Sequence, residues 1–259
     1  MAGKFDVSGQ VAIVTGGNVG IGVSIARTLL EEGASVVTCS RRDYDSPPAA
    51  EGLTGVDGRI VHMTCDVREP DQVEAVVNTA VERFGRIDVL VNNAGGSPGA
   101  DSATASPRFF AAIAAINLTG LLVFSQKANA VMQQQDDGGV IINISSVAGL
   151  QGAPFSVMYG AAKAGVINAT KSLAVEWGPK VRVNCIAPGL IMTEAAEYLA
   201  PTDEIKKAVA AGIPVRRIGD PEDISHVVHF LCSPAASYIN GETIVVDGGA
   251  RLRAGGGPG

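Results

Sequence analysis

Short apolar runs alternate with longer amphipathic runs along almost the whole chain, and this alternation constrains the fold more than any other feature. The short runs are rich in Val and Ile, as expected for parallel strands that helices cover on both faces. The predicted strands are residues 11–15, 35–39, 59–65, 87–91, 140–144, 181–186 and 243–246. The predicted helices are residues 20–32, 69–84, 105–135, 156–177, 193–211 with a break at Pro201, and 221–231.

Strands that alternate with helices in this way form βαβ units, which build an α/β fold with a doubly wound sheet. We therefore predict a single-domain Rossmann fold, in which seven mostly parallel strands carry helices on both faces. Right-handed crossovers bring the carboxyl ends of the strands to one edge, where ligands bind. No linker or repeat divides the chain, so residues 1–249 are expected to form one domain. Residues 41–58 are expected to be a loop, and the Gly-rich residues 250–259 a disordered tail.

Composition excludes several classes of protein. The formal net charge of −6 and the isoelectric point near 5.1 argue against nucleic acid or an anionic membrane as a partner. The four cysteines form no C-x-x-C pair, and no metal site is predicted. The first residues contain no apolar signal core, so a cytoplasmic protein is expected. The uncharged stretches 109–126 and 138–162 contain polar residues, Gly or Pro, so we expect them to be buried in the core or between subunits.

A glycine-rich segment joins the first predicted strand to the first predicted helix. It reads Thr15-Gly16-Gly17-Asn18-Val19-Gly20-Ile21-Gly22, and its spacing departs from the G-x-G-x-x-G fingerprint. Glycines let the chain turn sharply and let a pyrophosphate approach the N–H groups at a helix N-terminus. The segment therefore predicts a phosphate-binding turn, with a tight turn that binds nothing as the alternative.

The residues after the next strands bear on the choice of nucleotide. The segment Cys39-Ser40-Arg41-Arg42 offers no carboxylate to the ribose of NAD, whereas Arg41 and Arg42 would attract the 2′-phosphate of NADP. NADP(H) is therefore favoured over NAD(H), with solvated loop arginines as the alternative. Asp66, which precedes Val67, is expected either to hydrogen-bond an adenine or to cap the following helix. The small residues of Asn92-Asn93-Ala94-Gly95 leave room for a ribose or a nicotinamide.

One tyrosine is a candidate proton-transfer group. Of the four tyrosines only Tyr159 has a lysine, Lys163, four residues later on a predicted helix, where the two side chains share a face. A phenol with a pKa of about 10 is a poor base at neutral pH, but an adjacent ammonium favours the phenolate. Together they predict a general acid/base, although such a pair alone is usually a surface feature.

Three further features support a site around this tyrosine. Ser145-Ser146 ends the fifth strand, where one hydroxyl is placed to hydrogen-bond a substrate oxygen. Asn117 is a polar residue in an apolar helix and needs a buried partner. Pro188-Gly189 follows the sixth strand, and with Ile191 and Thr193 it is expected to close over a nicotinamide.

In these features the sequence resembles the short-chain dehydrogenase/reductase family over residues 7–249. The glycine turn, Asp66, residues 92–95, Asn117, Ser146, the Tyr159–Lys163 pair and Pro188-Gly189 carry the resemblance. The resemblance implies that Tyr159 transfers the proton, that Lys163 lowers its pKa and holds a ribose, and that Ser146 orients the carbonyl. It also implies that Asn117 anchors a water and that Ser145 is structural. The implied cofactor-binding residues are Thr15, Gly16, Asn18, Gly20, Ile21, Gly22, Ser40, Arg41, Asp66, Val67, Asn93, Ala94, Gly95, Tyr159, Lys163, Pro188, Gly189, Ile191 and Thr193.

The sequence thus predicts an NAD(P)(H)-dependent oxidoreductase that interconverts a secondary alcohol and a ketone. Apolar residues in segments 150–158 and 190–199 suggest a largely apolar small molecule, such as a 3-oxoacyl thioester or a steroid-like ketone. By resemblance we expect a homotetramer, with a homodimer as the alternative. A nucleotide-binding regulator without turnover, and an epimerase or dehydratase, remain the competing functions. His62, His226 and His229 suggest no metal site, and Lys206, Lys207, Arg216 and Arg217 are expected to be solvated rather than to bind a coenzyme A phosphate.

Overall fold

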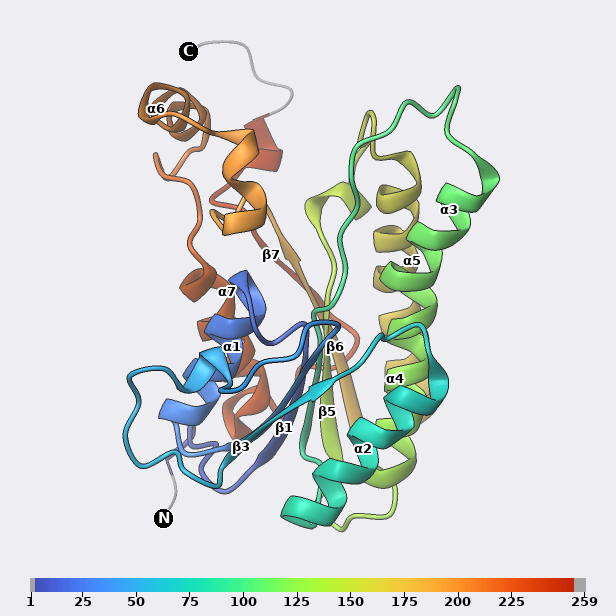
Figure 1. Cartoon of the computed structure of the whole chain (residues 1–259), viewed down its shortest axis with the longest axis vertical. Coiled ribbons are helices and arrows are strands. Elements are labelled where there is room, and N and C mark those ends of the chain that lie inside the picture. The colour runs from blue at the N-terminus through green and yellow to red at the C-terminus, as the bar shows by residue number, and fades with distance from the viewer. Residues whose placement is uncertain (1–2, 254–259) are drawn as a thin grey trace.

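A computed structural model describes residues 3–253 and contains a seven-stranded parallel sheet in the order β3-β2-β1-β4-β5-β6-β7 (Figure 1). The strands are β1 (Val11–Thr15), β2 (Ser35–Ser40), β3 (Ile60–Thr64), β4 (Val89–Asn92), β5 (Gly139–Ile144), β6 (Val181–Pro188) and β7 (Thr243–Val246). Every pair of neighbouring strands is parallel. The predicted α/β fold is therefore confirmed, including the number of strands.

Helices cover both faces of the sheet. They are α1 (Gly20–Glu31), α2 (Pro70–Phe84), α3 (Pro107–Ala114), α4 (Gly120–Met132), α5 (Val157–Trp177), α6 (Asp203–Gly212) and α7 (Pro221–Cys232). Helices α1 and α7 pack together on one face, and α2, α4 and α5 cover the other (Figure 1). The helix predicted over residues 105–135 is interrupted by a π-helical turn, Ala115–Thr119, between α3 and α4.

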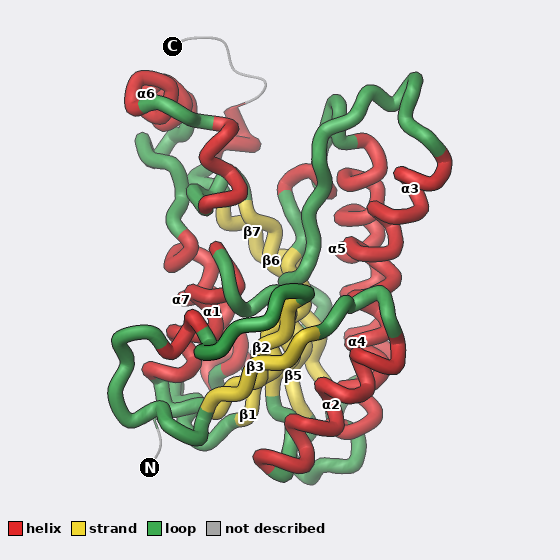
Figure 2. Tube along the Cα trace, viewed as in Figure 1, coloured by secondary structure: helices red, strands yellow, loops and turns green. Residues whose placement is uncertain are grey.

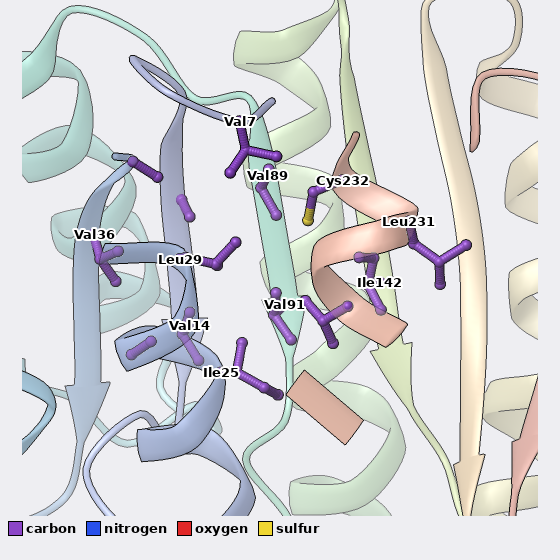
Figure 3. Close-up of a cluster of buried hydrophobic side chains, with 14 of the residues drawn as sticks. Val7, Val14, Ile25, Leu29, Val36, Val89, Val91, Ile142, Leu231 and Cys232 are labelled. Atoms are coloured by element: carbon purple, nitrogen blue, oxygen red, sulfur yellow. The ribbon is translucent and has the colours of Figure 1, made fainter. Parts of the chain in front are cut away.

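The core forms as two layers because side chains alternate along each strand. On β1, Ala12 and Val14 join the cluster beneath α1 and α7, whereas Val11 and Ile13 join the cluster beneath α2 and α4. Figure 3 shows the first cluster, in which Ile25 of α1 and Leu231 of α7 point toward the strands. The continuous apolar strands are thus explained by burial on both faces.

The strand order reverses between β1 and β4, which are neighbours in the sheet. The chain leaves β1 toward α1 on one face and leaves β4 toward α3 and α4 on the other (Figure 1). In open α/β sheets this arrangement opens a crevice outside the carboxyl ends of the strands. The glycine turn, residues 93–96 and the residues after β5 and β6 all lie at that edge.

Three segments test the remaining expectations about the chain. Residues 41–58, between β2 and β3, contain only the 3-10 turn Pro48–Ala50, as predicted, and the rest is loop (Figure 2). The predicted tail was wrong at its start, because Ala250–Arg253 forms a 3-10 turn in which Asp247 accepts hydrogen bonds from the N–H groups of Ala250 and Arg251. Residues 254–259 of that tail lie outside the described residues.

The helical stretch Pro107–Met132 has the length and mean hydropathy of a membrane span, but it also forms one layer of this fold.

Candidate functional site

A cavity of about 750 Å³ lies at the carboxyl edge of the sheet. It extends from Arg41 and Arg42 after β2 to Tyr159 and Lys163 on α5. The predicted site residues that line it are Gly16, Asn18, Gly20, Ile21, Gly22, Ser40, Arg41, Asp66, Val67, Asn93, Ala94, Gly95, Ser146, Tyr159, Lys163, Pro188, Gly189, Ile191 and Thr193. Two predicted residues, Thr15 and Asn117, are buried beside the cavity and do not line it.

Thr15 and Asn93 fix the glycine turn to the end of β4. The Thr15 hydroxyl accepts hydrogen bonds from the N–H groups of Asn93 and Ala94, at 2.9 and 3.0 Å. The Asn93 amide donates to the carbonyls of Thr15 and Gly16, at 2.9 and 3.2 Å. Thr15 therefore shapes the cavity through the backbone, and its role in cofactor binding stays a prediction.

The glycines of this turn are required by close approach and by backbone conformation. A Cβ at Gly22 would lie 2.1 Å from the carbonyl oxygen of Gly16, and Gly16 and Gly20 have positive φ angles of 65° and 53°. Helix α1 begins at Gly20 with no side-chain cap and no acidic residue in its first turn. Its N-terminus is therefore open to an anion, and these residues fit the pyrophosphate of a dinucleotide.

Acidic and basic side chains flank the cavity beyond β2 and β3. Asp66 pairs with Arg68 at 2.8 Å and also accepts a hydrogen bond from the Arg68 N–H. The Arg68 guanidinium lowers the pKa of Asp66, and the charge of Arg41 lowers it further. Because α2 begins at Pro70 with Glu69 before it, Asp66 does not cap that helix, and the capping alternative is wrong. Arg41 and Arg42 are exposed at the cavity edge.

The structure separates the two serines after β5. Ser145 is buried and donates from its hydroxyl to the Lys163 carbonyl at 2.8 Å, so its role is structural, as expected. Ser146 lines the cavity, and its hydroxyl accepts a hydrogen bond from the Ala148 N–H at 3.1 Å. Ser146 and Tyr159 both line this end of the cavity, and the Ser146 hydroxyl acts to lower the pKa of the phenol.

Lys163 supports Tyr159 from beneath the ring. Its Nζ lies 5.6 Å from the centroid of the Tyr159 ring and donates to the carbonyl of Ile144 at 2.8 Å. Burial lowers the pKa of the Lys163 ammonium to about 8. Burial raises the pKa of the Tyr159 phenol, and the hydrogen bond with Ser146 opposes that rise. The sequence predicted that the ammonium favours the phenolate; in the structure the ammonium lies over the ring and donates to a carbonyl, and burial raises the pKa of the phenol.

Asn117 lies in the π-helical turn and finds its partners in the backbone. Its amide donates to the carbonyls of Gly96 and Ile113, at 2.9 and 3.0 Å, and its oxygen accepts from the Gly96 N–H at 2.8 Å. A Cβ at Gly95 would lie 2.7 Å from that oxygen and 3.3 Å from Nζ of Lys163. Asn117 therefore fixes the segment after β4 against the floor of the cavity, and its predicted contact with a water stays a prediction.

Comparison with known proteins decides the family. A family model described as enoyl-(acyl carrier protein) reductase matches residues 16–251. A structure described as a short-chain dehydrogenase/reductase, glucose/ribitol dehydrogenase, from Brucella melitensis matches with a TM-score of 0.89 and 33% identity, covering 96% of this chain and 99% of that chain. The chain belongs to the short-chain dehydrogenase/reductase family. It is therefore an NAD(P)-dependent oxidoreductase.

Two curated relatives of this short-chain dehydrogenase/reductase share most of its length. A 3alpha-hydroxysteroid dehydrogenase from Mediterraneibacter gnavus is 39% identical over 245 residues, covering 93% of this chain and 97% of the relative. A 3-oxoacyl-[acyl-carrier-protein] reductase from Thermotoga maritima is 38% identical over 248 residues, covering 94% and 98%. The resemblance inferred from the motifs is thus confirmed at the level of the family.

Sequence reasoning missed several residues that line the cavity. Tyr44 and Gly96 lie at its wall, as does Val19. Tyr44 gave no signal, because it lies in a polar loop whose path the sequence does not predict. Arg42, named with Arg41, and Leu190, in the apolar segment 190–199, also line the cavity.

Arg217 is one of the basic residues considered for a coenzyme A phosphate, and it forms an ion pair with Asp223. Its guanidinium contacts both carboxylate oxygens of Asp223, at 2.5 and 2.6 Å, which lowers the pKa of Asp223 to about 2. Asp223 also accepts from the Asp220 N–H and so completes the capping box of α7. Arg217 was expected to be solvated; it is half exposed, but this ion pair holds its guanidinium. No cluster that could hold a metal occurs among residues 3–253.

Replacement of Asp223 with asparagine is expected to lower the urea midpoint at pH 7 by roughly 0.3 M, because the paired arginine is half exposed. The pKa of Asp223 is lower in the folded chain than its ordinary value of 3.8, so its stabilising effect is present above pH 4 and is lost as the pH falls toward 2. Urea denaturation at pH 7 and pH 3 should therefore show a smaller difference at pH 3. Asp57→Asn, in an exposed loop, is the control and should change neither midpoint.

Proposed function

We propose that this chain is an NADP(H)-preferring enzyme that interconverts a secondary alcohol and a ketone on a largely apolar small molecule. One observation carries the proposal: Ser146, Tyr159 and Lys163 gather at one end of a cavity whose other end holds Arg41 and Arg42. The open N-terminus of α1 and the glycine turn line the same cavity between these ends. A dinucleotide cofactor needs an anion site for its phosphates and proton-transfer groups beside its nicotinamide. The cavity offers residues for both.

In ketone reduction, Tyr159, Ser146 and Lys163 each have a separate role. When bound, the nicotinamide supplies the hydride to the carbonyl carbon or accepts it in the reverse direction. The Tyr159 phenol donates its proton to the carbonyl oxygen, which the Ser146 hydroxyl holds in place. Because burial raises its pKa, Tyr159 carries that proton at neutral pH. The Lys163 ammonium stabilises the phenolate that forms, and in alcohol oxidation the same phenolate removes the proton.

The cavity mouth supports an apolar substrate. Leu150 and Phe155, before α5, and Tyr198 and Leu199, just after the lining residue Ala196, are exposed, and a narrow crevice with Phe109 and Phe155 in its walls shares Tyr159 with the main cavity. Exposed apolar groups gathered beside polar catalytic groups are typical of a ligand site. We therefore propose a 3-oxoacyl thioester or a steroid-like ring ketone as the substrate class. The names of the two curated relatives are consistent with both classes.

Phe155 gives a direct test of this substrate class. Its backbone has a φ of 61°, which suits glycine, and its ring is 70% exposed, while its carbonyl accepts from the Ala100 N–H at 2.8 Å. Phe155→Gly is expected to leave thermal stability within about 1 kcal/mol of the wild type, because relief of strain offsets added chain entropy.

For a steroid-like or long-chain ketone, Phe155→Gly should raise KM about tenfold, because the substrate loses an apolar contact. Kinetics with a short aliphatic ketone should remain unchanged. Phe155→Leu keeps an apolar wall and should retain most of the affinity. Equal losses for short and long ketones would argue against Phe155 as part of the substrate wall.

Titration of the purified protein with NADPH and NADH, followed by fluorescence, tests the cofactor preference. We expect NADPH to bind about tenfold more tightly, because a 2′-phosphate gains charge-assisted hydrogen bonds from arginine. The double variant Arg41→Ala, Arg42→Ala should remove this preference, whereas Arg108→Ala, on the exposed side of α3, should keep it. Binding of neither dinucleotide would overturn the proposed function. Binding without turnover of any ketone would favour the regulator instead.

Composition and exposed apolar faces bear on location and assembly. A cytoplasmic protein is consistent with the acidic composition and the described fold. Only a third of the most apolar window of α3 and α4 is buried within the chain, and Val175 on α5 is exposed. We propose that copies of the chain cover these faces in a homotetramer, with a homodimer as the alternative, and sedimentation equilibrium would distinguish the two.

A further inference from the structure

His62, on β3, lies where three segments around the cavity meet. Its Nδ1 is 2.8 Å from the amide nitrogen of Asn18 in the glycine turn and 3.2 Å from the Thr38 hydroxyl on β2. Its Nε2 is 3.0 Å from the carbonyl oxygen of Arg42, in the loop after β2. The ring of Tyr44, in the same loop, meets the His62 ring edge to face with centroids 5.4 Å apart.

The polarity of these contacts defines the tautomer of His62. A carbonyl oxygen only accepts and an amide NH₂ only donates, so Nε2 must carry the proton toward Arg42 while Nδ1 accepts from Asn18. A neutral imidazole with its proton on Nε2 satisfies both contacts. In this tautomer His62 donates one hydrogen bond to the loop after β2 and accepts one from the glycine turn.

The orientation of the Asn18 side chain depends on its hydrogen bond to His62. It is 4% exposed, and its amide nitrogen contacts both His62 and the Ser40 hydroxyl, the latter at 3.1 Å. Its side-chain oxygen is buried without a hydrogen-bond partner among the described residues. All the contacts that orient this side chain are therefore on its nitrogen, toward His62 and Ser40.

The Arg42 carbonyl is held in a similar way. It accepts from Nε2 of His62 and from the Ser40 hydroxyl at 3.0 Å. The loop that follows, residues 43–58, has a single 3-10 turn, Pro48–Ala50, as its regular structure. The backbone from which the Arg41 and Arg42 side chains extend is therefore fixed largely by hydrogen bonds from β3 and from the end of β2.

We propose that His62 is a positioning residue that determines cofactor specificity, because it fixes the Arg42 backbone and so holds the two guanidiniums where a 2′-phosphate binds. The inference rests on the proposed function, since it assumes that a dinucleotide occupies this cavity. His62 does not line the cavity, so it acts through Arg42, Asn18 and Tyr44 rather than by contact with the ligand.

Three variants of the full chain test the role of His62. His62→Leu keeps the bulk but has neither donor nor acceptor. His62→Gln retains one donor and one acceptor at similar reach, and His62→Asn is polar but shorter. Dissociation constants for NADPH and NADH are measured by fluorescence titration, alongside the melting temperature of each variant.

We expect His62→Leu and His62→Asn to weaken NADPH binding about tenfold and NADH binding less than about threefold. His62→Gln should recover most of the NADPH affinity. In the Arg41→Ala, Arg42→Ala background, His62→Leu should cause no further loss of NADPH affinity. Should the leucine variant fail to fold, the comparison of His62→Asn with His62→Gln decides alone.

Equal weakening of NADPH and NADH in the variants, or glutamine failing to restore NADPH binding, would overturn the role of His62. A wild type that prefers NADH would also overturn it. A wild type that binds neither nucleotide refutes the proposed function itself, so the two failures are distinguished by the first titration.

Discussion

Tyr159→Phe is expected to lower turnover about a thousandfold, because the variant lacks the hydroxyl that we propose as the proton donor. Dinucleotide affinity should remain nearly unchanged, since the ring and its packing over Lys163 are retained. The carbonyl would keep its contact with Ser146 but would receive no proton as the hydride arrives. The loss should therefore appear in kcat more than in KM.

Single-turnover reduction of a long-chain or steroid-like ketone with NADPH, followed at 340 nm, measures the effect of Tyr159→Phe. Tyr238→Phe is the matched control, because that tyrosine is fully exposed and lies outside the cavity. A Tyr159→Phe variant that retains more than about a tenth of the wild-type rate would show that another group transfers the proton.

The fold could be predicted because its determinants are local. The apolar strands must be buried on both faces, and the turn from β1 to α1 requires glycine where a Cβ at Gly22 would meet the backbone at 2.1 Å. The π-helical turn at Asn117 could not be predicted, because residues 109–123 are apolar on nearly all sides and so hide the change of phase that an extra residue causes. The 3-10 turn after Gly249 was missed for a similar reason, since its hydrogen bonds come from Asp247 rather than from its own sequence.

Most of the predicted site residues line one cavity, but their electrostatics could not be predicted from the sequence. The spacing of Tyr159 and Lys163 correctly placed both on α5, yet it does not say where the ammonium points. The carbonyl of Ile144 attracts that ammonium, and burial then governs both pKa values. His62 was considered only as a metal ligand, because its contacts with Asn18 and Arg42 join segments far apart in the sequence.

Lys163→Met is expected to abolish turnover and, at pH 7, to raise the free energy of unfolding by about 2 kcal/mol. The ammonium is 4% exposed and forms no ion pair within residues 3–253. Burial lowers the pKa of Lys163 from 10.5 to about 8, which corresponds to a cost of about 3 kcal/mol for keeping it charged. Methionine avoids that cost but leaves the Ile144 carbonyl without its donor, a loss of about 1 kcal/mol.

The dependence on pH separates this explanation from simple repacking of Lys163. Between about pH 8 and 10.5 the unfolded chain binds the Lys163 proton more strongly than the folded chain, so wild-type stability rises with pH relative to Lys163→Met. Urea denaturation at pH 7 and at pH 9.5 should show the advantage of the variant shrinking toward zero. Lys171→Met, at an exposed position of the same helix, should show no such change. If Lys163→Met were less stable than the wild type at pH 7, the buried ammonium would be a net stabilising group, and this enzyme would keep Lys163 at no cost in stability.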